Sequence, residues 1–419
     1  MIMRTLAVLL VSGVLGAGAI GAAVKLTPAP VSVAVDHDWE KSRPGPDSGR
    51  VAILIDALGR TDPVVCDLLA DQLGNFWMGG GRNGVGRLAA APATLQIAKD
   101  SIHGAITDPR AINRLVAELD GPNACTRRVA SKLLGNSNVT AARLNGLLTD
   151  ASANVRESAA MAAGAGEKRD ALPALERALN DRSPAVAAMA AWAIGEIEDH
   201  SSVPALLRLV RDGDVKVRLS AIWALGQIED ARAVPDIVAV LRDENPAIRE
   251  MAADVLGDIE KEEAREPLER ALAGDADAKV RAEAAESLGQ ISSPLSGAAL
   301  GKALSDADIT VRRAAAEALG DLDELRVAPS GLVAALSAGD PELRYHAARA
   351  LAEIHDPATT SALIGILSSP DAELRKDAVE ALGEIGTAPA VDAITKALTD
   401  RDPEVRKAAA EALGDIKDG

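Results

Sequence analysis

The sequence is nearly free of aromatic residues, with one Tyr, one Phe and four Trp among 419 residues. A buried core must therefore be built from Ala, Leu, Val and Ile, which suits thin helices in close contact. Histidine is almost as scarce, and the five histidines are scattered: His37, His103, His200, His346 and His355. Neither an HExxH motif nor a His-Glu dipeptide occurs, so the sequence predicts no metal site, no cofactor and no catalytic residue.

Only two cysteines are present, Cys66 and Cys125. Export from the cell would permit a disulfide between them. In a regular stack of helical repeats they would lie two repeats apart, and packed helices are roughly 8–10 Å from each other. That separation exceeds the reach of a disulfide. A disulfide and a pair of buried free thiols therefore both stay open.

Positive charge is in short supply over most of the chain. The net charge is −17, and because the first 150 residues carry +2, residues 151–419 carry −19. A strongly acidic surface repels phosphate backbones, which argues against nucleic acid as a partner.

What the chain has in abundance is a repeat, exemplified by residues 214–228, which read DVKVRLSAIWALGQI. Its Arg recurs every 29–32 residues, with Ala187 filling one place, at Arg127, Arg156, Arg218, Arg249, Arg281, Arg312, Arg344, Arg375 and Arg406. A Gly follows eight residues after nearly every one of these positions. A fixed period of this length indicates a repeat array.

Each repeat predicts a pair of helices. Four residues before the Arg stands Asp, Asn or Ser, as at Asp214, which is a typical helix N-cap. This second helix has an apolar face, whereas a first helix, such as residues 203–211, precedes it. One hairpin cannot bury its apolar face, but stacked hairpins can. An Asp six residues before most of the Arg positions predicts a ladder of charge-assisted bonds between adjacent repeats.

The N-terminal region differs from the array. Residues 1–24 combine Arg4 with an apolar run and small residues, which is typical of a secretory signal peptide. An uncleaved anchor is the alternative, because this run could nearly span a bilayer. Residues 25–50 predict a Pro- and Ser-rich linker. We therefore expect an exported protein, periplasmic or secreted, or one anchored through its N-terminus.

The repeats themselves fall into two parts. Residues 51–150 hold degenerate units, in which Cys66 and Gln96 take the place of the Arg, whereas residues 151–419 hold the regular array. Together they predict an all-α solenoid of about twelve stacked hairpins.

The stretches Asp308 to Leu322 and Asp402 to Ile416 resemble the HEAT repeat superfamily, and most closely the short bacterial units also found in phycobilin lyases. The resemblance implies a right-handed curved solenoid with the second helices on its concave side. It also implies a binding scaffold, because the family mostly supplies such scaffolds. The iron-binding His-Glu pairs of one HEAT-type hydroxylase and the basic, aromatic face of HEAT-type DNA glycosylases do not occur here.

These observations favour a non-enzymatic protein–protein interaction scaffold of the bacterial cell envelope. The alternatives are a bilin-lyase-like enzyme that handles a chromophore and a substrate adaptor for an envelope protease. The expected partner is a protein or peptide with an apolar anchor beside basic groups. Membrane contact is expected only through an uncleaved N-terminal segment.

The binding site is predicted on one stripe of the second helices, at the positions one, five and nine residues after the Arg. Two of the four Trp fall on this stripe in adjacent repeats, and exposed aromatics flanked by charge are typical of a binding hot spot. The predicted partner-binding residues are Met161, Trp192, Leu219, Trp223, Glu250, Asp254, Asp258, Tyr345 and Arg349. The alternative is that Trp192 and Trp223 pack locally over the helix ridge.

Overall fold

The computed structural model describes residues 48–58 and 105–418, all within one unit of the chain, Pro44–Gly419. These residues form α-helices joined by short turns, and the β-type pairing among them is an isolated bridge between Ile106 and Ser137. The prediction of an all-α fold is confirmed. None of the described helices is both long and apolar enough to span a bilayer.

The described residues after Asp108 form ten helical hairpins, each made of a first and a second helix. The first helices are short, and 3-10 turns extend several of them. The first helices are α5 (Pro109–Glu118), α7 (Ala141–Leu147), α9 (Leu172–Ala178), α11 (Val203–Leu207), α13 (Val234–Val240), α15 (Arg265–Gly274), α17 (Gly297–Ala303), α19 (Ser330–Ala335), α21 (Thr360–Ile366) and α23 (Ala388–Ala397).

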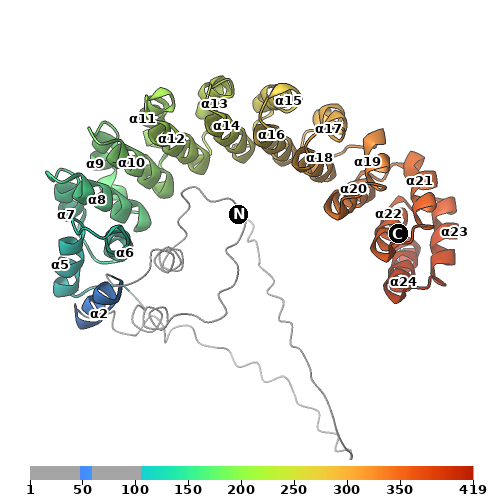
Figure 1. Ribbon diagram of the computed structural model, residues 1–419, viewed down its shortest axis with the longest axis horizontal. Coiled ribbons are helices and arrows are strands. Elements are labelled where there is room, and N and C mark those ends of the chain that lie inside the picture. Colours follow the sequence, from blue (N-terminus) through green and yellow to red (C-terminus); the bar gives the residue numbers. More distant parts are fainter. Residues whose placement is uncertain (1–47, 59–104, 419) are drawn as a thin grey trace, which may run out of the picture. The chain divides into compact units, whose positions relative to one another are not determined.

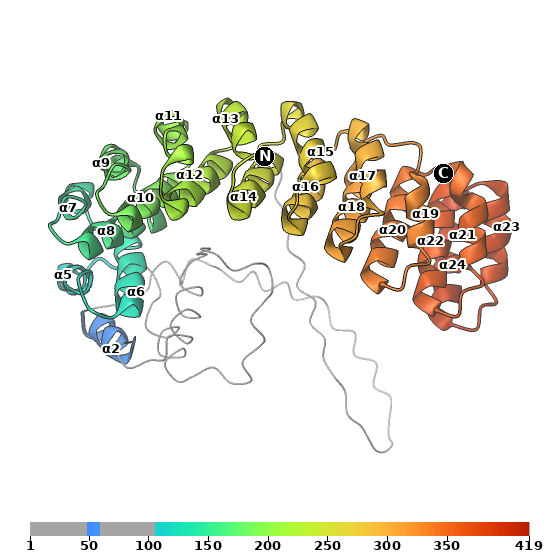
Figure 2. The same ribbon diagram turned by 45° about the horizontal axis from the view of Figure 1, so that its top comes forward.

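The second helices are longer and lie side by side, each against the second helix of the next repeat. Figures 1 and 2 show them as the inner layer of the row, with the first helices outside. The second helices are α6 (Ala124–Gly135), α8 (Ala153–Ala165), α10 (Pro184–Ile197), α12 (Val215–Ile228), α14 (Pro246–Asp258), α16 (Ala278–Ile291), α18 (Ile309–Asp321), α20 (Pro341–Ile354), α22 (Ala372–Ile385) and α24 (Pro403–Asp418).

Within the described residues, one more helix precedes the hairpins. Helix α2 (Ser48–Leu58) begins inside the segment expected to be a linker, and it packs against α5 and α6. Its Val51 and Leu54 are buried. The backbone N–H of Ser48 donates to a carboxylate oxygen of Asp108 at 3.0 Å. The rest of the two degenerate units, including Gln96, lies outside the described residues.

The second helices begin directly after the residues that the sequence predicted as N-caps. Asn123 and Asp214, for example, each accept two backbone N–H bonds in the first turn of α6 and α12. Ser152 and Ser183 occupy the N-cap position without a side-chain bond of this kind. The polar residue thus marks each start, and at most starts it also satisfies amide groups that the helix leaves unpaired.

In most second helices the inner Gly allows the next second helix to approach closely, whereas α20 has Ala352 in its place. A Cβ placed on Gly257 would lie 2.9 Å from the Cα of Ser287 in α16, and a Cβ on Gly289 would lie 3.0 Å from the Cα of Ala318 in α18. Contacts this short leave no room for a side chain. Glycine lowers the stability of a helix by roughly 1 kcal/mol relative to alanine. Close packing between second helices offsets this loss.

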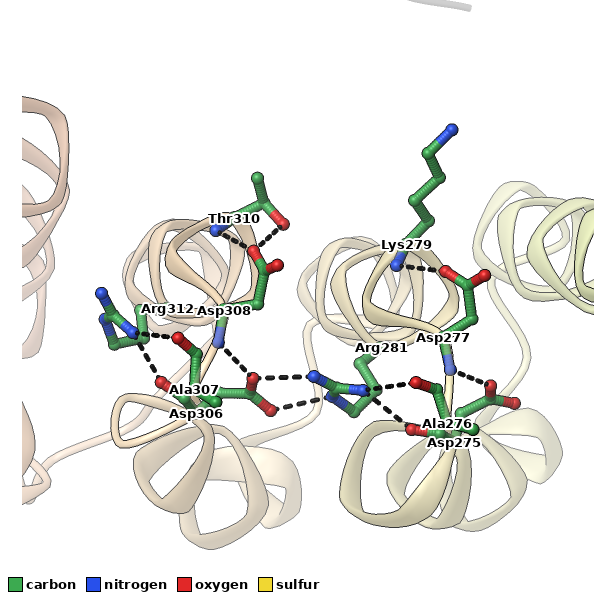
Figure 3. A network of polar contacts seen from close by, with 10 residues as sticks. All are labelled: Asp275, Ala276, Asp277, Lys279, Arg281, Asp306, Ala307, Asp308, Thr310 and Arg312. Carbon is green, nitrogen blue, oxygen red and sulfur yellow. Dashed lines mark hydrogen bonds and ion pairs between the residues drawn. The ribbon is translucent and has the colours of Figure 1, made fainter.

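The predicted charge ladder is present along the edge where the second helices begin. Arg281 shows the pattern in Figure 3: its Nε and one Nη atom donate to the two carboxylate oxygens of Asp306 in the next repeat, at 2.8 and 2.9 Å. The other Nη atom donates to the backbone carbonyl of Asp275, six residues earlier, at 2.8 Å. The Asp306 carboxylate also accepts the backbone N–H of Asp308.

The same pairing recurs along the array. Further ladder pairs, 25 or 26 residues apart, are Arg156–Asp181, Arg218–Asp243, Arg249–Asp275 and Arg375–Asp400. The Arg375 guanidinium lowers the pKa of Asp400 to about 2. Because each Arg holds its own turn and its neighbour's turn at once, the ladder fixes the spacing of adjacent repeats.

The turn after a second helix is also repeated. The residue that ends it takes the left-handed conformation, with φ between 46° and 62°, and Gly386 is the one glycine among the described residues in this position. The others are Glu167, Glu198, Glu229, Glu260, Ser292, Glu324 and His355. Left-handed geometry is a common helix ending, although it usually falls on glycine.

Candidate functional site

The stripe predicted to bind a partner runs along the contact between successive second helices, and this placement buries Trp192 and Met161. Trp192 is 3% exposed and Met161 is 7% exposed, so the prediction that they form an exposed surface is wrong. The reason is the Gly of the preceding helix. The Trp192 ring fills the space above Gly164, where its Cζ3 atom lies 2.8 Å from the place of an added Cβ.

Trp223 repeats this arrangement one unit later, against Gly195. Trp223 and Leu219 are both partly buried and pack against the core. The alternative interpretation, local packing of the two tryptophans, fits this geometry better than a hot spot does. The hydrophobic anchor of the predicted site is therefore mostly part of the core.

The acidic part of the stripe forms a cluster with residues from the next helix. Glu250, Asp254 and Asp258 of α14 lie close enough to Glu283 of α16 to act on its carboxylate, and Glu286 does the same. Burial and these neighbouring charges raise the pKa of Glu283 to about 8. These five carboxylates are called the central acidic cluster below.

Sequence reasoning missed Glu283. It lies two residues after the repeat Arg, where other repeats place Ser220, Met251 or Ala314. This position is mostly buried between second helices. A carboxylate at a position that most repeats fill with small or apolar side chains was the available signal, and Asp377 is the second carboxylate at this position.

Tyr345 and Arg349 lie on α20, two second helices away from the cluster, with α18 between α16 and α20 (Figure 1). Tyr345 is 55% exposed, as predicted for a contact residue. The guanidinium of Arg349 donates to a carboxylate oxygen of Asp321 on α18 at 2.8 Å. The acidic residues of α14 and the pair on α20 thus lie on two separate surfaces.

Beside Tyr345 the structure forms a groove of about 450 Å³ between α20 and α22. Tyr345 and Ala352 line it from α20, and Asp377, Glu380 and Glu384 line it from α22. Burial raises the pKa of Asp377 to about 6, and Glu380 adds to this effect while Lys376 opposes it.

A second groove, of about 480 Å³, lies on the other side of α22 against α24. Glu380 and Glu384 line it from α22, and Glu411 and Asp415 line it from α24. These two grooves, called the first and second groove below, share the acidic ridge of Glu380 and Glu384.

The remaining polar candidates form no centre of chemistry within the described residues. His200, His346 and His355 each lie within 4.0 Å of a single carboxylate, of Asp230, Glu317 and Glu384 respectively. No group of three or more His, Cys, Asp or Glu side chains that could hold a metal ion occurs among the described residues.

Of the two cysteines, Cys125 lies within the described residues and Cys66 does not. Cys125 lies in the first turn of α6, partly buried against the core. Cys66 and the histidines His37 and His103 lie outside the described residues. The pairing of Cys66 with Cys125 therefore stays a prediction.

The comparisons with known proteins concern the repeats. The sequence matches HEAT repeats over residues 140–217, 206–289, 266–330 and 329–414. Among solved structures, the crystal structure of an engineered protein is similar, with 24% identity, coverage of 74% of this chain and 99% of that chain, and a TM-score of 0.46. No curated protein matches the sequence. Because the family matches extend over more than half of the chain and coincide with the stacked hairpins, the chain belongs to the HEAT repeat family.

Proposed function

We propose that the protein is a non-enzymatic scaffold of the bacterial cell envelope that binds a partner protein or peptide on the layer of second helices. HEAT repeats generally serve as protein-interaction scaffolds, which supports the class of function. The stacked second helices offer a long continuous surface, as solenoids do when they bind extended partners.

The observation that carries the proposal is the central acidic cluster. It gathers five carboxylates from α14 and α16, and burial, together with the four neighbouring carboxylates, raises the pKa of Glu283 to about 8. Cationic groups of a partner would relieve the repulsion between these carboxylates. The cluster would also attract such a partner electrostatically, over a range that decreases as the salt concentration rises. The partner we infer is therefore a protein with basic groups on its contact surface.

The location in the envelope rests on residues 1–24. Arg4 followed by an apolar run supports export. Intact-mass measurement of protein recovered from the periplasm tests it, and we expect an N-terminus near Val24. A full-length mass in the membrane fraction would support the anchor instead.

The binding proposal is tested by capture from solubilised membranes, with identification by mass spectrometry. The test variant is Glu250→Gln, Asp254→Asn and Asp258→Asn together. The control variant is Asp170→Asn, Glu263→Gln and Glu266→Gln, which removes the same charge from exposed residues. We expect one or more proteins that the wild type and the control capture and the test variant loses. Equal capture by all three would overturn the assignment of the surface.

A further inference from the structure

Helix α22 carries an acidic ridge between two grooves. Glu380 and Glu384 line both the first groove, against α20, and the second groove, against α24. They are separated by one helical turn, so both project from the same face of α22. The ridge is therefore reached from either groove.

The walls of the first groove differ in character. The α20 side supplies the exposed ring of Tyr345 and the methyl groups of Ala348 and Ala352, and it also carries Arg349, Glu353 and His355. The α22 wall supplies the carboxylates of Asp377, Glu380 and Glu384. An apolar ring opposite carboxylates matches a side chain that is long, apolar along its stem and cationic at its tip.

Each basic group beside the first groove already lies near a carboxylate, and Lys376 and His355 lie near the ridge itself. The Arg349 guanidinium is bonded to Asp321 on α18 at 2.8 Å. The Lys376 nitrogen lies 3.6 Å from Glu373 and 3.9 Å from Glu380. His355 Nε2 lies 3.5 Å from Glu384. Burial together with Glu380, Glu373 and Asp371 still raises the pKa of Asp377 to about 6, although Lys376 opposes the shift.

The second groove is more acidic. Its walls carry Glu380, Glu384, Glu411 and Asp415, and its floor is made of small residues such as Gly383. None of the described residues that line it is basic. The Nζ atom of Lys407, also on α24, lies 3.7 Å from a carboxylate oxygen of Glu411.

We propose that these two grooves bind an extended basic segment of the partner, which crosses α22 and places one Lys or Arg side chain in each groove. This inference rests on the proposed function and names the chemistry and spacing of the ligand. The ridge of Glu380 and Glu384 lies between the two cations and is shared by them. Tyr345 covers the cation in the first groove.

The spacing follows from geometry. Neighbouring packed helices lie roughly 8–10 Å apart, so grooves on either side of one helix are separated by about the same distance. A segment in the extended polyproline II conformation advances about 3.1 Å per residue and returns its side chains to the same side every third residue. The two cationic side chains should therefore be three residues apart in the partner's sequence.

Tyr345 gives a direct probe, because it is the only tyrosine in the chain. Biosynthetic incorporation of 3-fluorotyrosine yields a single ¹⁹F resonance at the first groove. The probes are capped synthetic peptides: Arg-Ser-Ser-Arg, its isomer Arg-Arg-Ser-Ser, and a version of the first with citrulline in place of arginine. Titrations run at low salt, where exposed charges act over tens of ångströms.

We expect Arg-Ser-Ser-Arg to shift the resonance and to bind about tenfold more tightly than Arg-Arg-Ser-Ser, because only the first peptide engages both grooves at once. The citrulline peptide should leave the resonance unmoved. Equal affinity for the two arginine isomers would overturn the two-groove arrangement. A shift by the citrulline peptide would overturn the charge assignment.

The test variant is Glu380→Gln with Glu384→Gln, and the control is Glu263→Gln with Glu266→Gln on the first-helix layer. All four residues are exposed, and circular dichroism verifies that both variants keep their helices. Only the test variant should lose the preference for Arg-Ser-Ser-Arg over Arg-Arg-Ser-Ser. An unchanged preference would overturn this inference. The outcome is separate from that of membrane capture, which tests the scaffold function through the central acidic cluster.

Discussion

The indole ring of Trp192 lies against Gly164 of the preceding second helix, with its Cζ3 atom 2.8 Å from the place that a Cβ on Gly164 would take. Because Gly164 has no side chain, the large ring of Trp192 fits into the space between α8 and α10 and fills it. Trp223 and Gly195 repeat the arrangement between α10 and α12. The two tryptophans thus join repeats.

Replacing Trp192 by Ala should therefore destabilise the fold. We expect a loss of about 3–5 kcal/mol in the free energy of unfolding, the usual cost of removing a buried aromatic side chain. Urea denaturation followed by circular dichroism measures it. The control is Tyr345→Ala, which removes a mostly exposed ring and should change little. Equal midpoints for the two variants would contradict the burial of Trp192.

The glycines can be tested in the same way. Gly257→Leu places a side chain against the backbone of Ser287, since even a Cβ would lie 2.9 Å from its Cα atom. Overpacking of this kind costs about 1–3 kcal/mol. Gly365→Leu in α21 is the matched control, because no atom lies within 4 Å of its added Cβ. Similar losses in both would show that the close approach of Ser287 is not responsible, because leucine is the better helix former at either position.

The ladder predicts unequal costs for two arginines. In Arg249→Met the carboxylate of Asp275, only 8% exposed, loses its bidentate partner. We expect a loss of roughly 3 kcal/mol, near the range for breaking a buried ion pair. Arg211→Met removes an exposed pairing with Asp236 and should cost at most about 1 kcal/mol. Thermal unfolding of the two variants decides, and equal shifts would argue against the ladder as a stabilising feature.

The ladder also has a vacant place. Ala187 stands where other repeats carry Arg, and Asp212 follows 25 residues later, the offset of Arg156 and Asp181. Ala187→Arg should add the missing pair and raise the free energy of unfolding by about 0.5–2 kcal/mol. Adding Asp212→Asn should cancel most of the gain. A destabilised Ala187→Arg variant would show that neighbouring side chains have closed the space.

The central acidic cluster predicts a dependence on pH. Because the pKa of Glu283 is raised from 4.5 to about 8, the folded protein holds this proton more tightly than the unfolded chain does. The stability it contributes is complete below pH 4.5 and is lost as the pH rises to about 8. Glu283→Gln should flatten this slope and unfold at a higher temperature than wild type at about pH 8.

The measurement is thermal unfolding across that pH range, with Glu317→Gln, an exposed residue of α18, as the control. The control should keep the wild-type slope. A Glu283→Gln variant that follows the wild type at every pH would contradict the burial of this carboxylate.

Features carried by residues that recur at fixed offsets could be predicted from the sequence, and features set by a contact between two particular side chains often could not. The N-cap at Asp214 and the ladder from Arg281 to Asp306 follow from offsets that recur along the chain. The exposure of Trp192 does not, because it is decided by Gly164, which lies 28 residues earlier and leaves room for the ring. Glu283 was missed for the same reason, since its charge environment comes largely from α14.

The left-handed residues at the ends of the second helices show what an isolated hairpin would lose. Glu198 and Glu229, with φ of 53° and 52°, hold a conformation that costs a non-glycine residue roughly 1–3 kcal/mol. Such a turn persists only where surrounding contacts impose it. A single hairpin cut from the array would give up this turn as well as its buried face. The bend that defines each repeat is thus a property of its neighbours, and the smallest autonomous folding unit of this chain is larger than the repeat visible in its sequence.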